Sequence, residues 1–360
     1  MLPTKRLIGR SAAALLAIGA LPVRGLDAQV AAVPPTPAVA SLGSCRLSTG
    51  VTLDDCRVAY RTYGRLSGAR DNVVLIPTFF AGRSEDHRFM LGDYVDTTRH
   101  HVVIVDALAD GYSSSPSNSR AGAAAFANVT IGDMVDIQHR FLTERLGLRH
   151  VRAVVGISMG GFQAFEWAVR YPTFSDAIVS IAGTPRATAY DRLIYETWRR
   201  SAELLDGPYA NADSAWMQAS RLETLFMRTT RFSNDSGDAW VTRSARELAA
   251  GYRSASWSLA DYAAQLQAIG AHDISVRFDG DMNRAASAVR ARMLIVWSPD
   301  DMLVDPRPSA AFARLVGAET LAVPSDCGHA VFWCEPGRIG GAVRTFLEKP
   351  TAVSQRPSAR

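Results

Sequence analysis

The chain has 360 residues, 48% of them hydrophobic and 21% charged, and its 39 Lys and Arg residues against 35 Asp and Glu residues give a formal charge of +4. This composition is typical of a globular protein with a large core and excludes a disordered or fibrous chain. The weak positive charge gives no reason to expect nucleic acid as a partner. The length fits one large domain with insertions or two small ones.

The first 28 residues have the pattern of a secretory signal peptide. Three basic residues precede the apolar run 11–23, and small residues near Ala28 offer a cleavage site. The run is well short of the ~20 residues that a membrane-spanning helix needs, so a membrane anchor is the weaker alternative. We therefore expect a periplasmic or secreted protein, in which residues 29–43 form a flexible leader rich in Ala, Pro and Val.

Short apolar, β-branched runs alternate with helical patterns through the body of the chain. Such runs are typical of buried strands in a parallel sheet, and they occupy residues 73–76, 101–105, 151–155, 177–181, 293–297 and 320–323. Between them lie helix candidates such as residues 131–146, with Thr130 in the N-cap position and Gly147 after the end. The alternation predicts an α/β sheet covered by helices on both faces.

One long stretch, residues 186–290, breaks this alternation. It is mainly helical, contains four tryptophans and no convincing strand, and is too long for an ordinary loop. We interpret it as a helical cap inserted into an α/β core, whose two parts are residues 44–185 and 291–348. Residues 349–360 are expected to form a flexible tail.

The strongest catalytic signal is a Gly-x-Ser-x-Gly pattern at residues 156–160, between an apolar strand and an amphipathic stretch. The glycines leave room for a sharp turn from strand to helix, so the hydroxyl of Ser158 would stand out above the sheet. The same turn directs the N–H of Met159 toward the carbonyl oxygen of a bound ester. An ordinary Gly-rich turn is the alternative, but the expected partners of a nucleophilic serine follow in the right order.

A serine hydroxyl needs a base to remove its proton, and in this architecture an acid and then a histidine follow the serine. Asp300, Asp301 and Asp305 follow the strand at 293–297, at the edge of the sheet where ligand sites lie. Of the seven histidines only His329 comes after these acids. We expect Asp301 to orient His329, with Asp300 as the alternative, and we interpret the other six histidines as surface or satisfied core groups.

The second donor to the oxyanion is expected from residues 77–82, the loop after an early strand. Phe79 and Phe80 are both able to present a backbone N–H there, and their rings would line the pocket. The alternative is that each ring only fills the core. The proposed chemistry needs no metal or organic cofactor.

The four cysteines predict disulfides, because disulfides persist outside the cytoplasm. Cys45 and Cys56 lie close in sequence, and so do Cys327 and Cys334, which favours these two pairs among the three connectivities. A structural metal site is the weaker alternative, since neither C-x-x-C nor H-E-x-x-H is present.

Together these residues resemble the homoserine O-acetyltransferase-like branch of the α/β-hydrolase superfamily. The likeness lies in residues 58–66, which look like that family's opening strand pair, and in residues 129–135, 153–169 and 277–279. The resemblance implies an α/β-hydrolase fold with a mostly parallel sheet. It also implies a triad of Ser158, Asp301 and His329, with Phe79 where the family has an oxyanion-hole leucine.

Two departures from the family change the expected acyl acceptor. The family's transferases carry an acid immediately after the catalytic histidine, where it holds the amino group of homoserine, but here that residue is Ala330. The family's histidine-led loop is replaced by residues 77–82. An exported protein is also separated from cytoplasmic acetyl-CoA. These observations argue against homoserine as the acceptor.

We therefore predict an exported serine hydrolase that cleaves a small or medium carboxylic ester through an acyl-enzyme. One alternative is an acyltransferase that passes the acyl group to an alcohol or amine, and another is a non-catalytic binding protein on the same fold. The expected partner is a small-molecule ester or acyl donor, with no nucleic acid and no stable membrane span. The sequence leaves the substrate and the oligomeric state open, a homodimer included.

Overall fold

The computed structural model of the protein describes residues 36–204 and 211–349. The predicted signal peptide, residues 1–28, lies outside these residues, as do residues 29–35 of the predicted leader and 350–360 of the predicted tail. Strand β1 already begins at Ala38, so the prediction of a flexible leader as far as residue 43 was wrong for its last part. The physical reason is that residues 38–46 pair with the next strand, to which Cys45 is also covalently joined.

Eight strands form one sheet in the order β1-β2-β4-β3-β5-β6-β7-β8. Their bounds are β1 Ala38–Arg46, β2 Thr52–Tyr63, β3 Val73–Pro77, β4 His101–Val105, β5 Val151–Ile157, β6 Ser175–Ile181, β7 Arg292–Trp297 and β8 Glu319–Ala322. The pairs β1–β2 and β2–β4 are antiparallel and all others are parallel. The six predicted strands are confirmed as β3 to β8. Residues 58–63 belong to β2 alone rather than to a strand pair.

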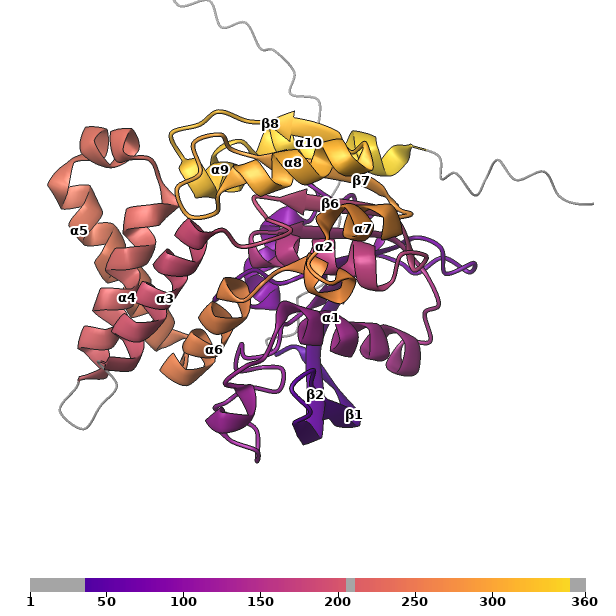
Figure 1. The fold of residues 1–360 in the computed structure, drawn as a ribbon, viewed down its shortest axis with the longest axis horizontal. Helices are drawn as coiled ribbons and strands as arrows, with labels where there is room; N and C mark the ends of the chain where they lie inside the picture. The colour runs from indigo at the N-terminus through magenta and orange to yellow at the C-terminus, as the bar shows by residue number, and fades with distance from the viewer. Residues whose placement is uncertain (1–35, 205–210, 350–360) are drawn as a thin grey trace, which may run out of the picture. The chain divides into compact units, whose positions relative to one another are not determined.

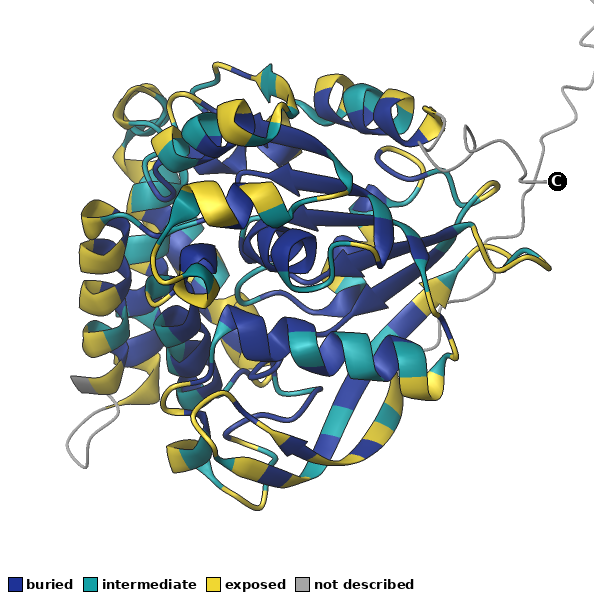
Figure 2. Cartoon of the chain, turned by 45° about the vertical axis from the view of Figure 1, so that its right-hand side comes forward, coloured by how far each residue is buried: buried dark blue, intermediate teal, exposed yellow. Residues whose placement is uncertain are grey.

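Helices cover both faces of the sheet, as predicted. One face packs on α1 (Ile131–Arg140), α2 (Met159–Arg170) and α8 (Pro306–Val316), and the other on η1 (Ser84–Met90) and α10 (Pro336–Glu348). Shorter turns are η2 (Ala123–Phe126), the π-helical η3 (Phe141–Arg145), η5 (Gly328–Ala330) and α9 (Val331–Cys334). The predicted N-cap is confirmed, because the Thr130 side chain accepts a hydrogen bond from the N–H of Asp133. Figure 2 shows the central strands of the sheet buried between these helices.

The described residues between β6 and β7 are mainly helical, as expected for a cap. They form α3 (Ala189–Leu204), α4 (Ala212–Met227), α5 (Thr230–Ser254), α6 (Leu259–Gly270), η4 (Ile274–Phe278) and α7 (Met282–Ala288). Helices α3 to α6 pack on one another beside the sheet, at the left of Figure 1. In contrast, η4 and α7 contact α2 and α8 of the core. In the described part of the chain, no helix combines the length and apolar character needed to cross a membrane.

Buried polar contacts fasten α6 to the core. Asp261 accepts hydrogen bonds from the backbone N–H and the hydroxyl of Ser117. Gln265 accepts one from the N–H of Ala81 at 2.9 Å and donates one to the carbonyl of Leu108 at 3.2 Å. Because the side chains of Asp261 and Gln265 are buried, breaking these contacts would leave their polar atoms unpaired, which is costly. The cap is therefore held in place on the side where the loop 77–82 lies.

Candidate active site

Ser158 stands at the sharp turn between β5 and α2. Its φ of 53° and ψ of −121° are strained for a residue with a side chain. The turn is tight because a Cβ on Gly156 would collide with the backbone of Gly160, and a Cβ on Gly160 would collide with the carbonyl of Pro77. The N–H of Ser158 donates to the carbonyl of Ile181 in the neighbouring strand. The backbone thus aims the hydroxyl away from the sheet and into the cavity described below.

The structure brings Ser158, His329 and Asp301 together from three loops at one edge of the sheet. The hydroxyl of Ser158 lies 2.9 Å from Nε2 of His329, and Nδ1 of His329 lies 2.8 Å from Oδ2 of Asp301. The other carboxylate oxygen, Oδ1, accepts hydrogen bonds from the N–H groups of Leu303 and Val304. The side chains of His329 and Asp301 are both 2% exposed, so this chain of hydrogen bonds is shielded from water.

The neighbouring acids point elsewhere. Asp300 is exposed, and its carboxylate accepts from the N–H of Ser325. Asp305 caps α8 and pairs with Arg307. Of the three acids that the sequence offered, Asp301 is therefore the one whose carboxylate meets the imidazole.

The loop after β3 departs from the prediction for Phe79. The N–H of Phe79 donates to Nε2 of the fully buried His87 at 3.0 Å, so it is already committed inside the core. The Nδ1–H of His87 donates to the carbonyl of Arg83, and burial lowers the pKa of His87 to about 4, which keeps the ring neutral. The assignment of the donor to Phe79 is therefore contradicted. Among the described residues no hydrogen bond uses the N–H of Phe80, which leaves it as this loop's candidate.

Met159 supplies the other candidate donor. Its N–H belongs to the first turn of α2, where backbone N–H groups have no partner within the helix. The side chain of Gln163, one turn further along α2, donates to the carbonyl of Thr78 at 2.9 Å. This contact fixes the loop 77–82 against the helix that carries Met159. Sequence reasoning did not single out Gln163 or His87, because their contacts with the loop 77–82 become visible only in the folded chain.

Ser158 and His329 open into a cavity of about 380 Å³ between core and cap. Its wall is largely aromatic and includes Phe79, Phe80, Trp198, Tyr252, Trp257 and Trp333. Leu303 and Met227 add aliphatic surface. A cavity of this size and lining suits a small organic molecule.

The chain is similar in sequence and fold to known proteins. A family model described as the alpha/beta hydrolase fold matches residues 71–336. The chain belongs to this family. It is similar to a homoserine O-acetyltransferase of Leifsonia xyli subsp. xyli, with 30% identity over 359 residues, covering 86% of this chain and 88% of that protein.

Two further relatives of this α/β-hydrolase carry esterase names. An ethyl acetate hydrolase of Pseudomonas veronii is 37% identical over 161 residues, so the matched part spans only 46% of that protein and 43% of this chain. The crystal structure of an acetylester hydrolase from Corynebacterium glutamicum superimposes with a TM-score of 0.80 at 25% identity, covering 87% of this chain and 96% of that one. The chain is therefore an enzyme of the homoserine O-acetyltransferase-like branch, an esterase or acyltransferase.

Two disulfides join Cys45 to Cys56 and Cys327 to Cys334, the same pairs that the spacing favoured. The first links β1 to β2. The second encloses His329 and the short helix η5 in a small loop. Within residues 36–204 and 211–349, no group of three or more His, Cys, Asp or Glu side chains is placed to hold a metal ion.

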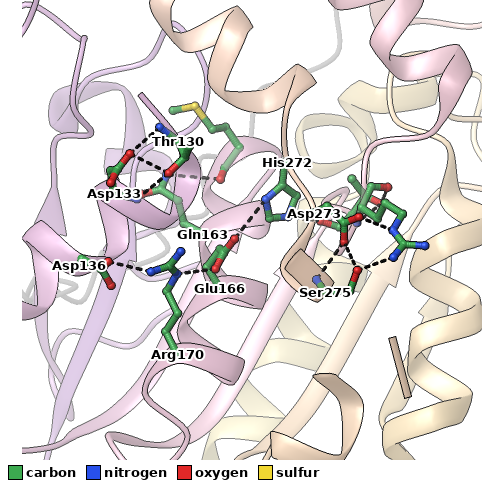
Figure 3. A network of polar contacts seen from close by, with 12 residues as sticks. Thr130, Asp133, Asp136, Gln163, Glu166, Arg170, His272, Asp273 and Ser275 are labelled. Carbon is green, nitrogen blue, oxygen red and sulfur yellow. Dashed lines mark hydrogen bonds and ion pairs between the residues drawn. The ribbon is translucent and has the colours of Figure 1, made fainter. Parts of the chain in front are cut away.

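A network of polar contacts joins α2 to α1 and to the segment before η4 (Figure 3). Glu166 pairs with Arg170 at 2.6 Å, and Arg170 reaches Asp136 of α1 at 2.7 Å. His272 lies 3.6 Å from Glu166 through Nδ1, and burial lowers the pKa of this histidine to about 4. His272 is thus buried in the core, but its Nδ1 has no hydrogen-bond partner among the residues that the structure describes, so the prediction of a satisfied core group holds only for Nε2. The network joins α1, α2 and the segment before η4, so it stabilises the helix that begins beside Ser158.

Proposed function

We propose that the protein is a serine hydrolase that cleaves a carboxylic ester through Ser158, His329 and Asp301. The observation that carries the proposal is the continuous chain of hydrogen bonds from the Ser158 hydroxyl through His329 to Asp301, at the wall of a cavity of substrate size. Such a chain removes the proton from the hydroxyl as it attacks, and the buried carboxylate stabilises the imidazolium that forms.

The reaction proceeds in two halves. In the first, Oγ of Ser158 bonds to the ester carbonyl carbon and its proton passes to Nε2 of His329, which then protonates the departing alcohol. In the second, water gives its proton to His329 and attacks the acyl carbon, and Ser158 leaves with that proton. The N–H groups of Met159 and Phe80 would donate to the negative oxygen in both halves.

Acyl transfer to an alcohol is the second candidate, and the similarity to a homoserine O-acetyltransferase favours it. It shares the acyl-enzyme and differs only in the molecule that removes the acyl group. The residue after His329 is the fully buried Ala330, which offers no carboxylate to an amino-acid acceptor. This observation favours water over homoserine.

Turnover of a p-nitrophenyl acyl ester by the chain lacking residues 1–28 tests the proposal. The Ser158→Ala variant is expected to lose turnover, and added alcohol or amino alcohol is expected to leave the product as free acid. Full activity in Ser158→Ala would refute the triad. Capture of most of the acyl group by the acceptor would establish the transferase instead.

We also propose that the protein is exported. The pattern of residues 1–28 and the two disulfides support this, because disulfides persist in oxidising compartments. Cell fractionation with an antibody is expected to find a shortened chain outside the cytoplasm. A full-length, reduced chain in the cytoplasm would contradict export.

A further inference from the structure

The cavity beside Ser158 contains a carboxyl group that the proposed mechanism does not use. Glu223, on the cap helix α4, lines the same cavity as Ser158 and His329. Helix α4 packs against η5, the short helix that carries His329. The carboxyl group and the imidazole therefore face one space, although they are about a hundred residues apart in the sequence.

Two tyrosines fix one oxygen of this carboxyl group. Oε2 of Glu223 accepts hydrogen bonds from the hydroxyl of Tyr252 at 2.7 Å and from that of Tyr262 at 3.2 Å. No hydrogen bond among the described residues involves Oε1. The tyrosines thus orient the carboxyl group and leave one oxygen for a molecule in the cavity.

The surroundings of Glu223 are otherwise aromatic. The ring of Phe80 lies 4.7 Å from that of Tyr262 and 5.4 Å from that of Trp198, and Tyr252 meets Trp257 edge-on. Burial of a carboxylate in such a place is unfavourable unless something pairs with it. Burial accordingly raises the pKa of Glu223 to about 7, against the opposing effect of the two tyrosine hydrogen bonds.

The charges around the cavity favour a cation as the partner of the Glu223 carboxylate. Asp86 provides a second carboxyl group, and the described residues of the wall include no Lys or Arg. A positive charge would be attracted by both acids and by the faces of the aromatic rings. A substrate carboxylate would face these two acids, and the described part of the wall offers it no Lys or Arg, which disfavours acidic acyl groups and amino acids.

We propose that this cavity accepts an ester that carries a positively charged amino group and no carboxylate, and that Oε1 of Glu223 recognises the charge. The inference rests on the proposed ester chemistry and adds a substrate class to it. The inference also changes how the absence of an acid at Ala330 is interpreted. The acid beside the catalytic histidine is absent, but a carboxyl group enters the same cavity from the cap.

Two pairs of esters that differ only in one charged atom test this inference. Acetylcholine and 3,3-dimethylbutyl acetate place nitrogen or carbon at the same point of the alcohol. Ethyl 4-(trimethylammonio)butanoate and ethyl 5,5-dimethylhexanoate do the same in the acyl part. In at least one of the two pairs, the wild-type chain is expected to show a kcat/KM at least about tenfold higher for the charged ester than for the neutral one. In Glu223→Gln, that ratio is expected to fall toward one.

Tyr262→Phe is the matched control. It removes one of the hydrogen bonds that lower the pKa of Glu223 but keeps the carboxyl group, so in assays at pH 8 or above it should retain most of the preference for charge. If Tyr262→Phe and Glu223→Gln lose the preference equally, a loosened cap explains the effect and the inference fails. A third ester, 3-hydroxy-3-methylbutyl acetate, replaces the charge by a neutral hydroxyl. If it is the best substrate, recognition of a cation is refuted.

Failure of the inference and failure of the proposed function are distinguishable. Ser158-dependent hydrolysis of the neutral esters without any preference for charge would refute the role of Glu223 and leave the esterase intact. If no ester is hydrolysed, calorimetry can measure the binding of acetylcholine to the Ser158→Ala chain. Binding that is lost in the double variant Ser158→Ala/Glu223→Gln would support the inference, and an absence of binding to Ser158→Ala would overturn it.

Discussion

The disulfide around His329 should matter for catalysis as well as for stability. Cys327 and Cys334 are seven positions apart and enclose the histidine whose Nε2 lies 2.9 Å from the Ser158 hydroxyl. Replacing both cysteines by serine opens this loop without leaving a free thiol. The loop-closure model assigns to such a short loop about 2.5 kcal/mol of unfolding free energy. A base displaced by about 1 Å costs up to about a hundredfold in rate, so we expect kcat to fall at least about tenfold.

The other disulfide provides a control of nearly equal energy. Cys45 and Cys56 are eleven positions apart, so the same model assigns about 3 kcal/mol to their bond. This bond joins β1 to β2 and is not part of the cavity wall. The double Cys45→Ser/Cys56→Ser variant should therefore lose similar stability but keep kcat within about twofold.

The assay combines urea unfolding with ester turnover below the unfolding midpoint. Wild-type kcat in the Cys327→Ser/Cys334→Ser variant would refute the idea that the disulfide positions His329. Equal losses of kcat in both double variants would also refute it, because the effect would then follow global stability rather than the loop.

Three further predictions concern single carboxyl groups. Asp301→Asn should lower kcat on the order of a thousandfold or more, because the imidazole of His329 loses the partner that fixes its tautomer. Asp300→Asn should change kcat by less than about threefold. Similar losses of kcat in both variants would refute the assignment of Asp301. Asp106 and Asp110 are both buried, and burial raises the pKa of each carboxyl group. Above pH 4 the folded chain therefore binds more protons than the unfolded one, so the free energy of unfolding should fall as the pH rises from 4 to 7. Urea midpoints should show a smaller fall in Asp110→Asn. Glu223 faces the hydroxyls of Tyr252 and Tyr262, and it shares its cavity with His329 and Asp86. Because its pKa is raised to about 7, its carboxyl group becomes negatively charged between pH 6 and 8, so the preference for acetylcholine over its neutral isostere should increase over this range. A ratio of kcat/KM values that does not change with pH would contradict this.

The fold could be predicted largely from local patterns. Buried parallel strands need continuous apolar runs, and six such runs became β3 to β8. The strand β1 was missed because most of its residues are exposed at the edge of the sheet, with only Leu42 and Cys45 buried, and its small side chains give little signal. It pairs with the next strand, β2, across the short turn 47–51, and composition does not reveal this hairpin.

The candidate site, like the fold, contains residues that could be predicted from local patterns and others that could not. Ser158, Asp301 and His329 follow from a local motif and from the order of elements along the chain. The oxyanion donor does not, because the direction of the Phe79 N–H depends on His87, which reaches it from a helix eight residues later. Only a folded backbone shows that the core already uses this N–H, which shifts the expected donor to Phe80.

Glu223 shows most clearly what lies beyond the sequence. It sits on a cap helix with no motif around it, and its significance comes from two tyrosines of α5 and α6 and from a cavity shared with His329. Helix α4 also packs against the loop that carries His329, where a Cβ on Gly328 would lie only 3.2 Å from the backbone of Arg228. One cap helix therefore contacts the loop of the base and carries the carboxyl group that faces the substrate. A change in α4 that moves Glu223 should also move His329, so substrate choice and rate are expected to change together when this helix is altered.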